Sequence, residues 1–272
     1  MTNDLPPLTS NPAKTSHIRG LIVDMDGVLW RGTEPVGDLP AIFRRIREHG
    51  WRIVLATNNA TRTPEQYQEK LLSYGVDLSP NEIINSAIAT ARYLSRRFPQ
   101  GGPVYIVGEE GLVEALSAAG FYACMQDPVA VVVGMDRQFT YEKMRVANQL
   151  IRNGALFIAT NTDKTFPTPD GLVPGAGAVI AGIETAAGVS PMVIGKPSTE
   201  MYRVSLDLLH TSPAETLAIG DRLETDIAGG QALGCLTALV LSGVTSIEQA
   251  KAWQPKPDWI AKDLAELLSM ID

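Results

Sequence analysis

The stretch Leu21–Trp30, LIVDMDGVLW, decides the fold, because an apolar run ends there at two carboxylates. Its first three residues are typical of the end of a buried strand. Asp24 and Asp26 follow at i and i+2, and such a place tolerates two carboxylates only where a cation or hydrogen bonds stabilise them. One carboxylate of such a pair can attack while the other handles protons. The structural alternative is a strand that ends in an acidic turn.

Strand-like and helix-like segments alternate along the rest of the chain. Strand patterns occur at 21–24, 52–57, 82–85, 104–107, 129–133, 156–160, 192–194, 216–220 and 236–241. Helix patterns occur at 38–49, 64–74, 175–187, 199–210 and 224–233. This alternation predicts an α/β protein with a Rossmann-like, doubly wound parallel sheet at its core.

The spacing of the polar strand ends predicts the domain organisation. Between Asp24 and Thr57 there is room for a hairpin-like loop and one helix. Between Thr57 and Lys196, about 100 residues remain beyond what the core needs, which is the size of a domain. We therefore expect a flexible N-terminal tail at 1–17, a core at 18–85 and 191–272, and an inserted α/β domain at 86–190.

The composition of the chain indicates which binding partners and which cellular compartment to expect. The chain has 272 residues and a net charge of −7, which argues against nucleic acid or an anionic membrane as its main partner. The two cysteines, Cys124 and Cys235, lie far apart among apolar residues and predict buried free thiols in a reducing compartment. Residues 1–17 lack the apolar centre of a signal peptide, and no segment has the pattern of a membrane span. We expect a cytoplasmic protein.

Further polar residues stand at the ends of other predicted strands. Thr57 and Asn58 follow the second strand, Lys196 follows the strand that ends at 194, and Asp221 and Asp226 follow the strand 216–220. Because sites in open parallel sheets form at the carboxyl ends of strands, these residues are expected to share one site. They supply carboxylates for a divalent cation, a hydroxyl and an amide for phosphate oxygens, and one positive charge.

Each of these residues also has a structural alternative. Thr57 and Asn58 could cap a helix, and Lys196 could be a solvated surface lysine. Asp221 could lie in a turn, and Asp226 could lie in the first turn of a helix. With the strand end that carries Asp24 and Asp26 there are four such ends, and four coincidences are much less probable than one. The functional interpretation is therefore favoured for the set as a whole.

The segments DMDGVLW, TNN, GKPS and GDRLETDI, in this order, resemble the four motifs of the haloacid dehalogenase (HAD)-like hydrolase superfamily. Trp30–Gly32 and the segment ATNTDKTFPTPDGLVPGAGAVIAGIE are similar to its subfamily IIA, the NagD-like or 4-nitrophenylphosphatase-like phosphatases. The resemblance covers about residues 18–265. It implies that the insertion at 86–190 is a cap domain and that the protein is a Mg²⁺-dependent phosphatase of small phosphomonoesters.

The resemblance also implies a role for each matching residue. Asp24 would be the nucleophile that forms an aspartyl-phosphate, and Asp26 the general acid and base. The Asp24 and Asp221 carboxylates and the Asp26 backbone carbonyl would bind Mg²⁺, and Asp226 would support that site from outside the ligand set. The residues that would bind the phosphate group are Thr57, Asn58 and Lys196.

The substrate and the quaternary structure stay open at this point. The resemblance implies that the loops 134–137 and 160–174, the latter with Asn161, Asp163 and Lys164, face the substrate, while a connection without ligand contact is the alternative. Nucleotides, sugar phosphates, pyridoxal phosphate, phosphoglycolate and glycerol phosphate all occur as substrates in the family. Homodimers through the cap are common in this branch. The functional alternatives are a phosphomutase and a catalytically silent regulatory module that binds a phosphate ligand.

Overall fold

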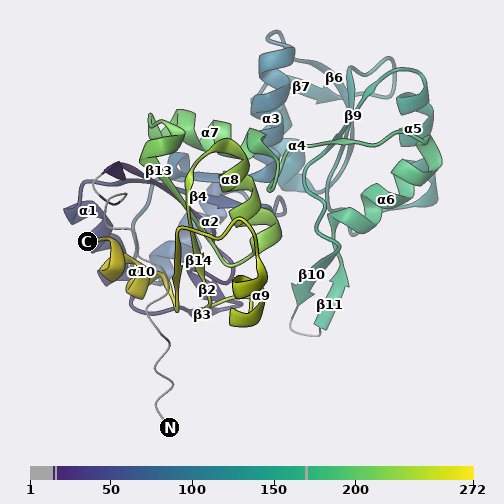
Figure 1. Cartoon of the computed structure of the whole chain (residues 1–272). Coiled ribbons are helices and arrows are strands. Elements are labelled where there is room, and N and C mark those ends of the chain that lie inside the picture. The colour runs from purple at the N-terminus through teal and green to yellow at the C-terminus, as the bar shows by residue number, and fades with distance from the viewer. Residues whose placement is uncertain (1–14, 16, 169–170) are drawn as a thin grey trace. The chain divides into compact units, whose positions relative to one another are not determined.

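The computed structural model describes residues 15, 17–168 and 171–272. The chain divides into two compact units, shown with their elements in Figure 1. The first unit, here called the core unit, contains the described residues up to Ala56 together with Tyr67–Ile83 and Tyr202–Asp272. The second unit contains Thr57–Gln66 and Ile84–Met201. Each unit is organised around its own sheet.

The sheet of the core unit has six strands in the order β15-β14-β13-β1-β4-β5. The strands are β1 (Gly20–Val23), β4 (Arg52–Thr57), β5 (Ile83–Asn85), β13 (Thr216–Gly220), β14 (Leu236–Val240) and β15 (Trp259–Ala261). β1 pairs in parallel with β4 on one side and with β13 on the other. The chain therefore changes direction across the sheet at β1, and the carboxyl ends of β1 and β13 form the switch point where such folds place their sites.

Helices and a short hairpin connect these strands. They are β2 (Trp30–Arg31), β3 (Glu34–Pro35), α1 (Leu39–Glu48), α2 (Pro64–Ser73), the 3₁₀ turns η2 (Pro80–Glu82) and η3 (Pro213–Glu215), α7 (Thr199–Leu209), the π-helix η4 (Leu223–Ile227), α8 (Ala228–Leu233), α9 (Ile247–Ala252) and α10 (Leu264–Ile271). α1 begins after Asp38, whose carboxylate accepts a hydrogen bond from the Ala41 N–H at 3.0 Å and so caps the helix. Among the described residues, no helix is long and apolar enough to cross a membrane.

Both faces of the core sheet are covered. Neighbouring residues of a strand point to opposite faces, and those of β14 pack into two different apolar clusters. Ala238 and Val240 of β14 belong to the large apolar cluster that also holds Phe43 of α1 and Leu268 of α10. Leu239, between them, packs instead with residues of η4 and α9. In Figure 1, α1 and α10 lie near each other beside this sheet. The predicted α/β, doubly wound core is confirmed.

The second unit is also a parallel α/β structure. Its sheet has the order β12-β9-β8-β6-β7, with β6 (Gly102–Val107), β7 (Phe121–Ala123), β8 (Ala130–Val133), β9 (Leu156–Ala159) and β12 (Met192–Val193). The remaining elements are α3 (Ser86–Arg97), α4 (Glu110–Ala118), α5 (Tyr141–Arg152), α6 (Ala176–Ala187) and the hairpin of β10 (Thr165–Thr168) with β11 (Gly171–Pro174). Figure 1 shows α5 and α6 together on one side of this sheet, where they pack on β8.

Three expectations differ from the structure. The strand expected at 192–194 in the core is β12, and it pairs in parallel with β9 of the second sheet. The helix expected at 224–233 begins as the π-helix η4 and continues as α8. The segment 160–174, expected as a loop, contains the hairpin β10–β11. In the first case the local sequence shows the strand but not its partner, because the pairing of a two-residue strand depends on a distant part of the chain.

Candidate active site

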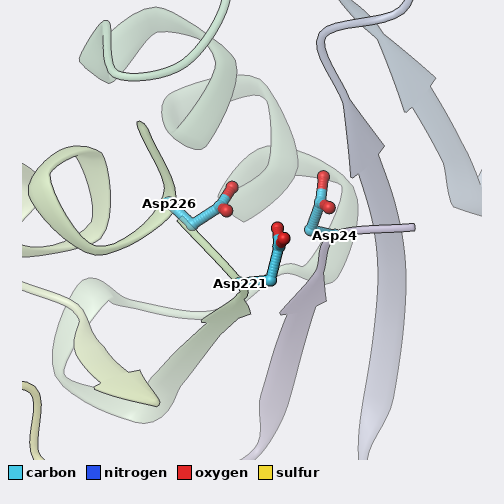
Figure 2. Close-up of side chains that lie close together, drawn as sticks. All are labelled: Asp24, Asp221 and Asp226. Carbon is cyan, nitrogen blue, oxygen red and sulfur yellow. The ribbon is translucent and has the colours of Figure 1, made fainter. Parts of the chain in front are cut away.

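Three acidic side chains meet at the switch point of the core sheet. Asp24 follows β1, Asp221 follows β13, and Asp226 lies in η4. Carboxylate oxygens, one from each of these residues, all lie within 4.8 Å of one another, and Figure 2 shows the three side chains side by side. The side chains are withdrawn from solvent, at 9, 1 and 3% relative exposure.

The Asp221 carboxylate is held by the loop that follows β14. Its Oδ2 accepts a hydrogen bond from the Val244 N–H at 2.8 Å. Two glycines make room for it: a Cβ on Gly27 would stand 2.5 Å from Asp221 Oδ2, and a Cβ on Gly243 would overlap the same oxygen. The carboxylate is therefore fixed between two stretches of backbone that only glycine permits at this distance.

Asp226 is held by its own turn and by α7. Its Oδ2 accepts from the Arg222 N–H at 3.0 Å, and its backbone carbonyl accepts from the Tyr202 hydroxyl at 2.8 Å. A Cβ on Gly220, the last residue of β13, would overlap the Asp226 side chain. The π-helical turn thus carries Asp226 against the end of the strand that positions Asp221, and π-helical turns are frequent at functional sites.

The cluster has the donor chemistry of a Mg²⁺ site. Mg²⁺ prefers oxygen ligands and is commonly bound by one or two carboxylates together with water and substrate phosphate. Three nearly buried carboxylates repel one another and lose solvation, and a divalent cation offsets both effects. Asp24, Asp221 and Asp226 therefore fit such an ion, and the cluster includes Asp226, which was expected to support the site from outside.

Asp26 stands apart from this cluster. Its side chain is exposed, and Oδ1 accepts a hydrogen bond from the Trp30 indole N–H at 2.8 Å. The two residues also form an isolated bridge across the turn that leads into β2. The Asp26 side chain thus lies outside the carboxylate cluster and is oriented by a residue of the β2–β3 hairpin. A group that exchanges protons with a substrate needs a defined orientation of this kind.

The expected phosphate-binding residues are buried in the second unit. Thr57 is the last residue of β4, and its Oγ1 accepts from the Asn59 N–H at 3.1 Å. Asn58 donates from Nδ2 to the Lys196 carbonyl at 2.9 Å, so the structure brings these two predicted residues together. Asn58 Oδ1 is buried without a hydrogen-bond partner in the described part of the chain. Lys196 is itself only 4% exposed, which contradicts the alternative of a solvated surface lysine.

The loops expected to face the substrate lie at the carboxyl ends of strands in the second sheet. Asn161 donates to Asp163 Oδ2 at 2.9 Å. Arg137 donates from Nε and from its terminal nitrogen to the two carboxylate oxygens of Glu109, each at 2.7 Å. This paired hydrogen bond holds the pKa of Glu109 below its usual value. Both loops are thus fixed by polar contacts within the unit.

Two features of the site escaped the sequence analysis. One is the contact of Trp30 with Asp26, four residues earlier, because Trp30 enters there only as part of the family resemblance. The other is the segment Ser242–Val244, which contacts Asp221 and, through the Ser242 hydroxyl, the Gly27 carbonyl at 2.7 Å. A signal was present in the second case, because the segment follows the apolar run 236–241 as the other site residues follow their strands.

Comparison with known proteins supports the expected relation to the haloacid dehalogenase-like hydrolases. A haloacid dehalogenase-like hydrolase family model matches residues 21–122, and a HAD-hydrolase-like model matches residues 193–267. The chain is 36% identical over 255 residues to an acid sugar phosphatase of Staphylococcus aureus, a match that covers 93% of this chain and 98% of that protein.

Solved structures agree with this result. NagD from E. coli K-12 is 36% identical and superposes with a TM-score of 0.86 over 92% of this chain and 98% of its own. A p-nitrophenyl phosphatase from Archaeoglobus fulgidus is 34% identical, with a TM-score of 0.87 over 93% of this chain and 98% of its own. The chain belongs to the HAD-like hydrolases, and within them to the NagD-like branch. It is an enzyme of the phosphoric monoester hydrolase class.

Proposed function

We propose that the protein is a Mg²⁺-dependent phosphatase that hydrolyses small phosphomonoesters through an aspartyl-phosphate on Asp24. The observation that carries the proposal is the cluster of Asp24, Asp221 and Asp226 at the switch point of the core sheet. Such a cluster is costly to bury unless a cation binds it, and it includes Asp24, the residue that the family pattern makes the nucleophile.

The reaction divides into two displacements at phosphorus. In the first, a carboxylate oxygen of Asp24 attacks the phosphorus while the leaving oxygen departs with a proton from Asp26. In the second, Asp26 takes a proton from water, and the resulting hydroxide displaces Asp24 and releases inorganic phosphate. Splitting the hydrolysis in this way replaces one difficult step with two easier ones.

Binding groups complete the proposal. We assign Mg²⁺ to the Asp24 and Asp221 carboxylates and the Asp26 backbone carbonyl, with Asp226 beside them. When bound, the cation neutralises charge on the transferring phosphoryl group. We assign the phosphate oxygens to the Thr57 hydroxyl, the Asn58 amide and the Lys196 ammonium; a positive charge there would offset the repulsion between the substrate and Asp24.

The role of the inserted segment and the cellular location of the protein are further parts of the proposal. We propose that residues 86–190 act as a cap that selects the leaving group, with the loops 134–137 and 160–174 facing the substrate, and that the protein works in the cytoplasm. The acid sugar phosphatase among the relatives suggests sugar phosphates as the first substrates to test. We propose that the protein forms a homodimer through the cap.

The decisive experiment measures phosphate release from a panel of sugar phosphates, nucleotides, glycerol phosphate and 4-nitrophenyl phosphate. It compares Mg²⁺ with chelator, and wild type with Asp24→Asn. Asp38→Asn serves as the matched control, because Asp38 only caps α1 and asparagine caps a helix equally well. Turnover that needs both Mg²⁺ and Asp24 supports the proposal. Transfer of phosphate between positions of one sugar would indicate a phosphomutase, and binding without turnover would indicate a regulatory module.

A further inference from the structure

The exposed carboxylate of Asp26 has one conspicuous partner, the buried side chain of Trp30. The Trp30 side chain is fully buried at the start of β2, and its indole N–H donates to Asp26 Oδ1 at 2.8 Å. An exposed carboxylate on a turn normally samples several rotamers. A hydrogen bond from a rigid, buried ring limits that freedom and fixes one oxygen of the carboxyl group.

The indole ring contacts Lys70 of α2 and Tyr74, the residue that follows α2. The Lys70 ammonium lies over the Trp30 ring, 3.9 Å from its centroid, and also donates to the Gly32 carbonyl at 3.0 Å. The Tyr74 ring lies 6.1 Å from the Trp30 ring, and the Tyr74 hydroxyl donates to the Thr33 carbonyl at 2.6 Å. Each of these two side chains therefore holds both the ring and the turn of the β2–β3 hairpin, so the ring and the turn form one unit with α2.

We propose that Trp30 is the positioning residue for Asp26, and that it dictates which Asp26 oxygen carries the proton. This inference rests on the proposed function, in which Asp26 is the acid and base. An indole nitrogen can only donate a hydrogen bond. Oδ1 therefore accepts this hydrogen bond. Because the carbonyl oxygen of a protonated carboxyl group is a better acceptor than its hydroxyl oxygen, the transferable proton resides on Oδ2, the oxygen left for the substrate.

The Lys70 ammonium strengthens this arrangement. A cation over the face of an aromatic ring is attracted to its π electrons and draws electron density from the ring. The indole N–H then becomes a better donor to a carboxylate, because linked polar groups polarise one another. Lys70 therefore acts on Asp26 through Trp30.

The test compares leaving groups that do and do not need a proton. An alkyl phosphate such as glycerol phosphate leaves as a poor alkoxide and depends on the acid, whereas 4-nitrophenolate leaves with little help. The quantity to measure is the ratio of kcat/KM for the two substrates, because kcat/KM reports only the steps up to the first irreversible one and so excludes the later attack by water. The variant is Trp30→Phe, which keeps an aromatic ring and removes the N–H.

Trp259→Phe is the matched control. Trp259 lies in β15 of the same unit and is also fully buried, but its indole N–H has no hydrogen-bond partner among the described residues. Both variants lose a similar volume from the core, and only one loses the bond to Asp26. General acid catalysis contributes about 10²–10⁴-fold, so we expect Trp30→Phe to lower the alkyl-to-aryl ratio by about ten-fold or more, in the direction of Asp26→Asn. Trp259→Phe leaves the ratio unchanged.

If Trp30→Phe lowers kcat/KM for both substrates by the same factor, so that the ratio stays constant as in Trp259→Phe, the proposal is overturned. Trp30 would then have only a structural role. If the wild type releases phosphate from no member of the substrate panel with Mg²⁺, the proposed function fails. The hydrogen bond is still tested in that event by the indole N–H resonance of Trp30, assigned by its loss in Trp30→Phe. Asp26→Leu should shift this resonance upfield and accelerate its exchange with solvent, and an unchanged resonance would contradict the inference.

Discussion

The backbone of Gly243 lies directly against the carboxylate of Asp221. Val244, the next residue, donates its N–H to Asp221 Oδ2 at 2.8 Å, and a Cβ on residue 243 would overlap that oxygen. The loop after β14 therefore controls where one of the three clustered carboxylates can stand. This relationship connects two segments that are separated in sequence by the whole of α8 and β14.

Gly243→Ala should therefore damage the cation site. The added methyl group must displace the Asp221 carboxylate, because neither the backbone nor the buried side chain has free space. We expect the Mg²⁺ concentration for half-maximal activity to rise about ten-fold or more, about 1.4 kcal/mol in binding. Gly182→Ala is the control, since a Cβ there would meet only Met144 Sδ at 3.6 Å. Equal Mg²⁺ requirements in Gly243→Ala and wild type would refute this role of Gly243.

Asp226→Asn should weaken cation binding without loss of the turn. The asparagine Oδ1 can still accept from the Arg222 N–H, which Asp226 Oδ2 now does, but one of the three clustered negative charges is lost. A ligand that binds only the folded state stabilises it by RT ln(1 + [L]/Kd), so at one Mg²⁺ concentration weaker binding gives a smaller rise in the melting temperature. The Mg²⁺-induced rise in Tm should thus be smaller in Asp226→Asn than in wild type or in Asp38→Asn. A rise of the same size in all three proteins would place Asp226 outside the cation site.

The two cysteines should differ in reactivity. Burial raises the pKa of Cys235 to about 12, so its thiolate is scarce at neutral pH, whereas Cys124 is only partly buried. Because the thiolate is the reactive form, a thiol reagent at about pH 8 should modify one cysteine rapidly in the native protein and both after unfolding. The rapid phase should vanish in Cys124→Ser. Two rapid thiols in the native protein would contradict the buried position of Cys235.

The ion pair of Glu109 and Arg137 should stabilise the second unit in a pH-dependent way. The Arg137 hydrogen bonds lower the folded-state pKa of Glu109 from its ordinary value of 4.5. Stability from this shift is therefore present above that value and is lost as the pH falls through the lowered pKa. Arg137 is largely exposed, so the effect should be at most about 1 kcal/mol.

The measurement is the difference in Tm between wild type and Arg137→Gln as a function of pH. It should be largest near neutral pH and should shrink in acid. Arg92→Gln, which removes an exposed arginine from α3, controls for the loss of charge. A difference that stays constant from neutral to acidic pH would show that Glu109 is not the partner that matters.

Much of the fold follows from local pattern. The expected strands 52–57 and 216–220 match β4 and β13 residue for residue, because a short run of buried apolar residues bounded by polar ones defines a central strand well. The helix expected at 38–49 is confirmed as α1, which Asp38 caps and Gly50 follows. The position of Asp24 and Asp221 directly after two strands follows from the same pattern, and the structure places these strands side by side.

The parts that local pattern missed all depend on contacts between distant segments. The two-residue strand β12 pairs with β9, and nothing in its own sequence distinguishes that sheet from the core sheet. Gly243 contacts Asp221 only because the loop after β14 folds back over the end of β13. Such contacts depend on how the sheet brings its strand ends together, which the spacing of residues does not show.

The sequence by itself determined that this chain is a doubly wound α/β protein and an HAD-like hydrolase, because strand periodicity and four short motifs are local properties. Only the tertiary structure decided how the acids are arranged: Asp24, Asp221 and Asp226 gather within 4.8 Å, while Asp26 turns to the Trp30 indole. The physical reason is that the direction of a side chain is set by its neighbours in space. Here these are two glycines beside Asp221 and a ring held by α2 beside Asp26.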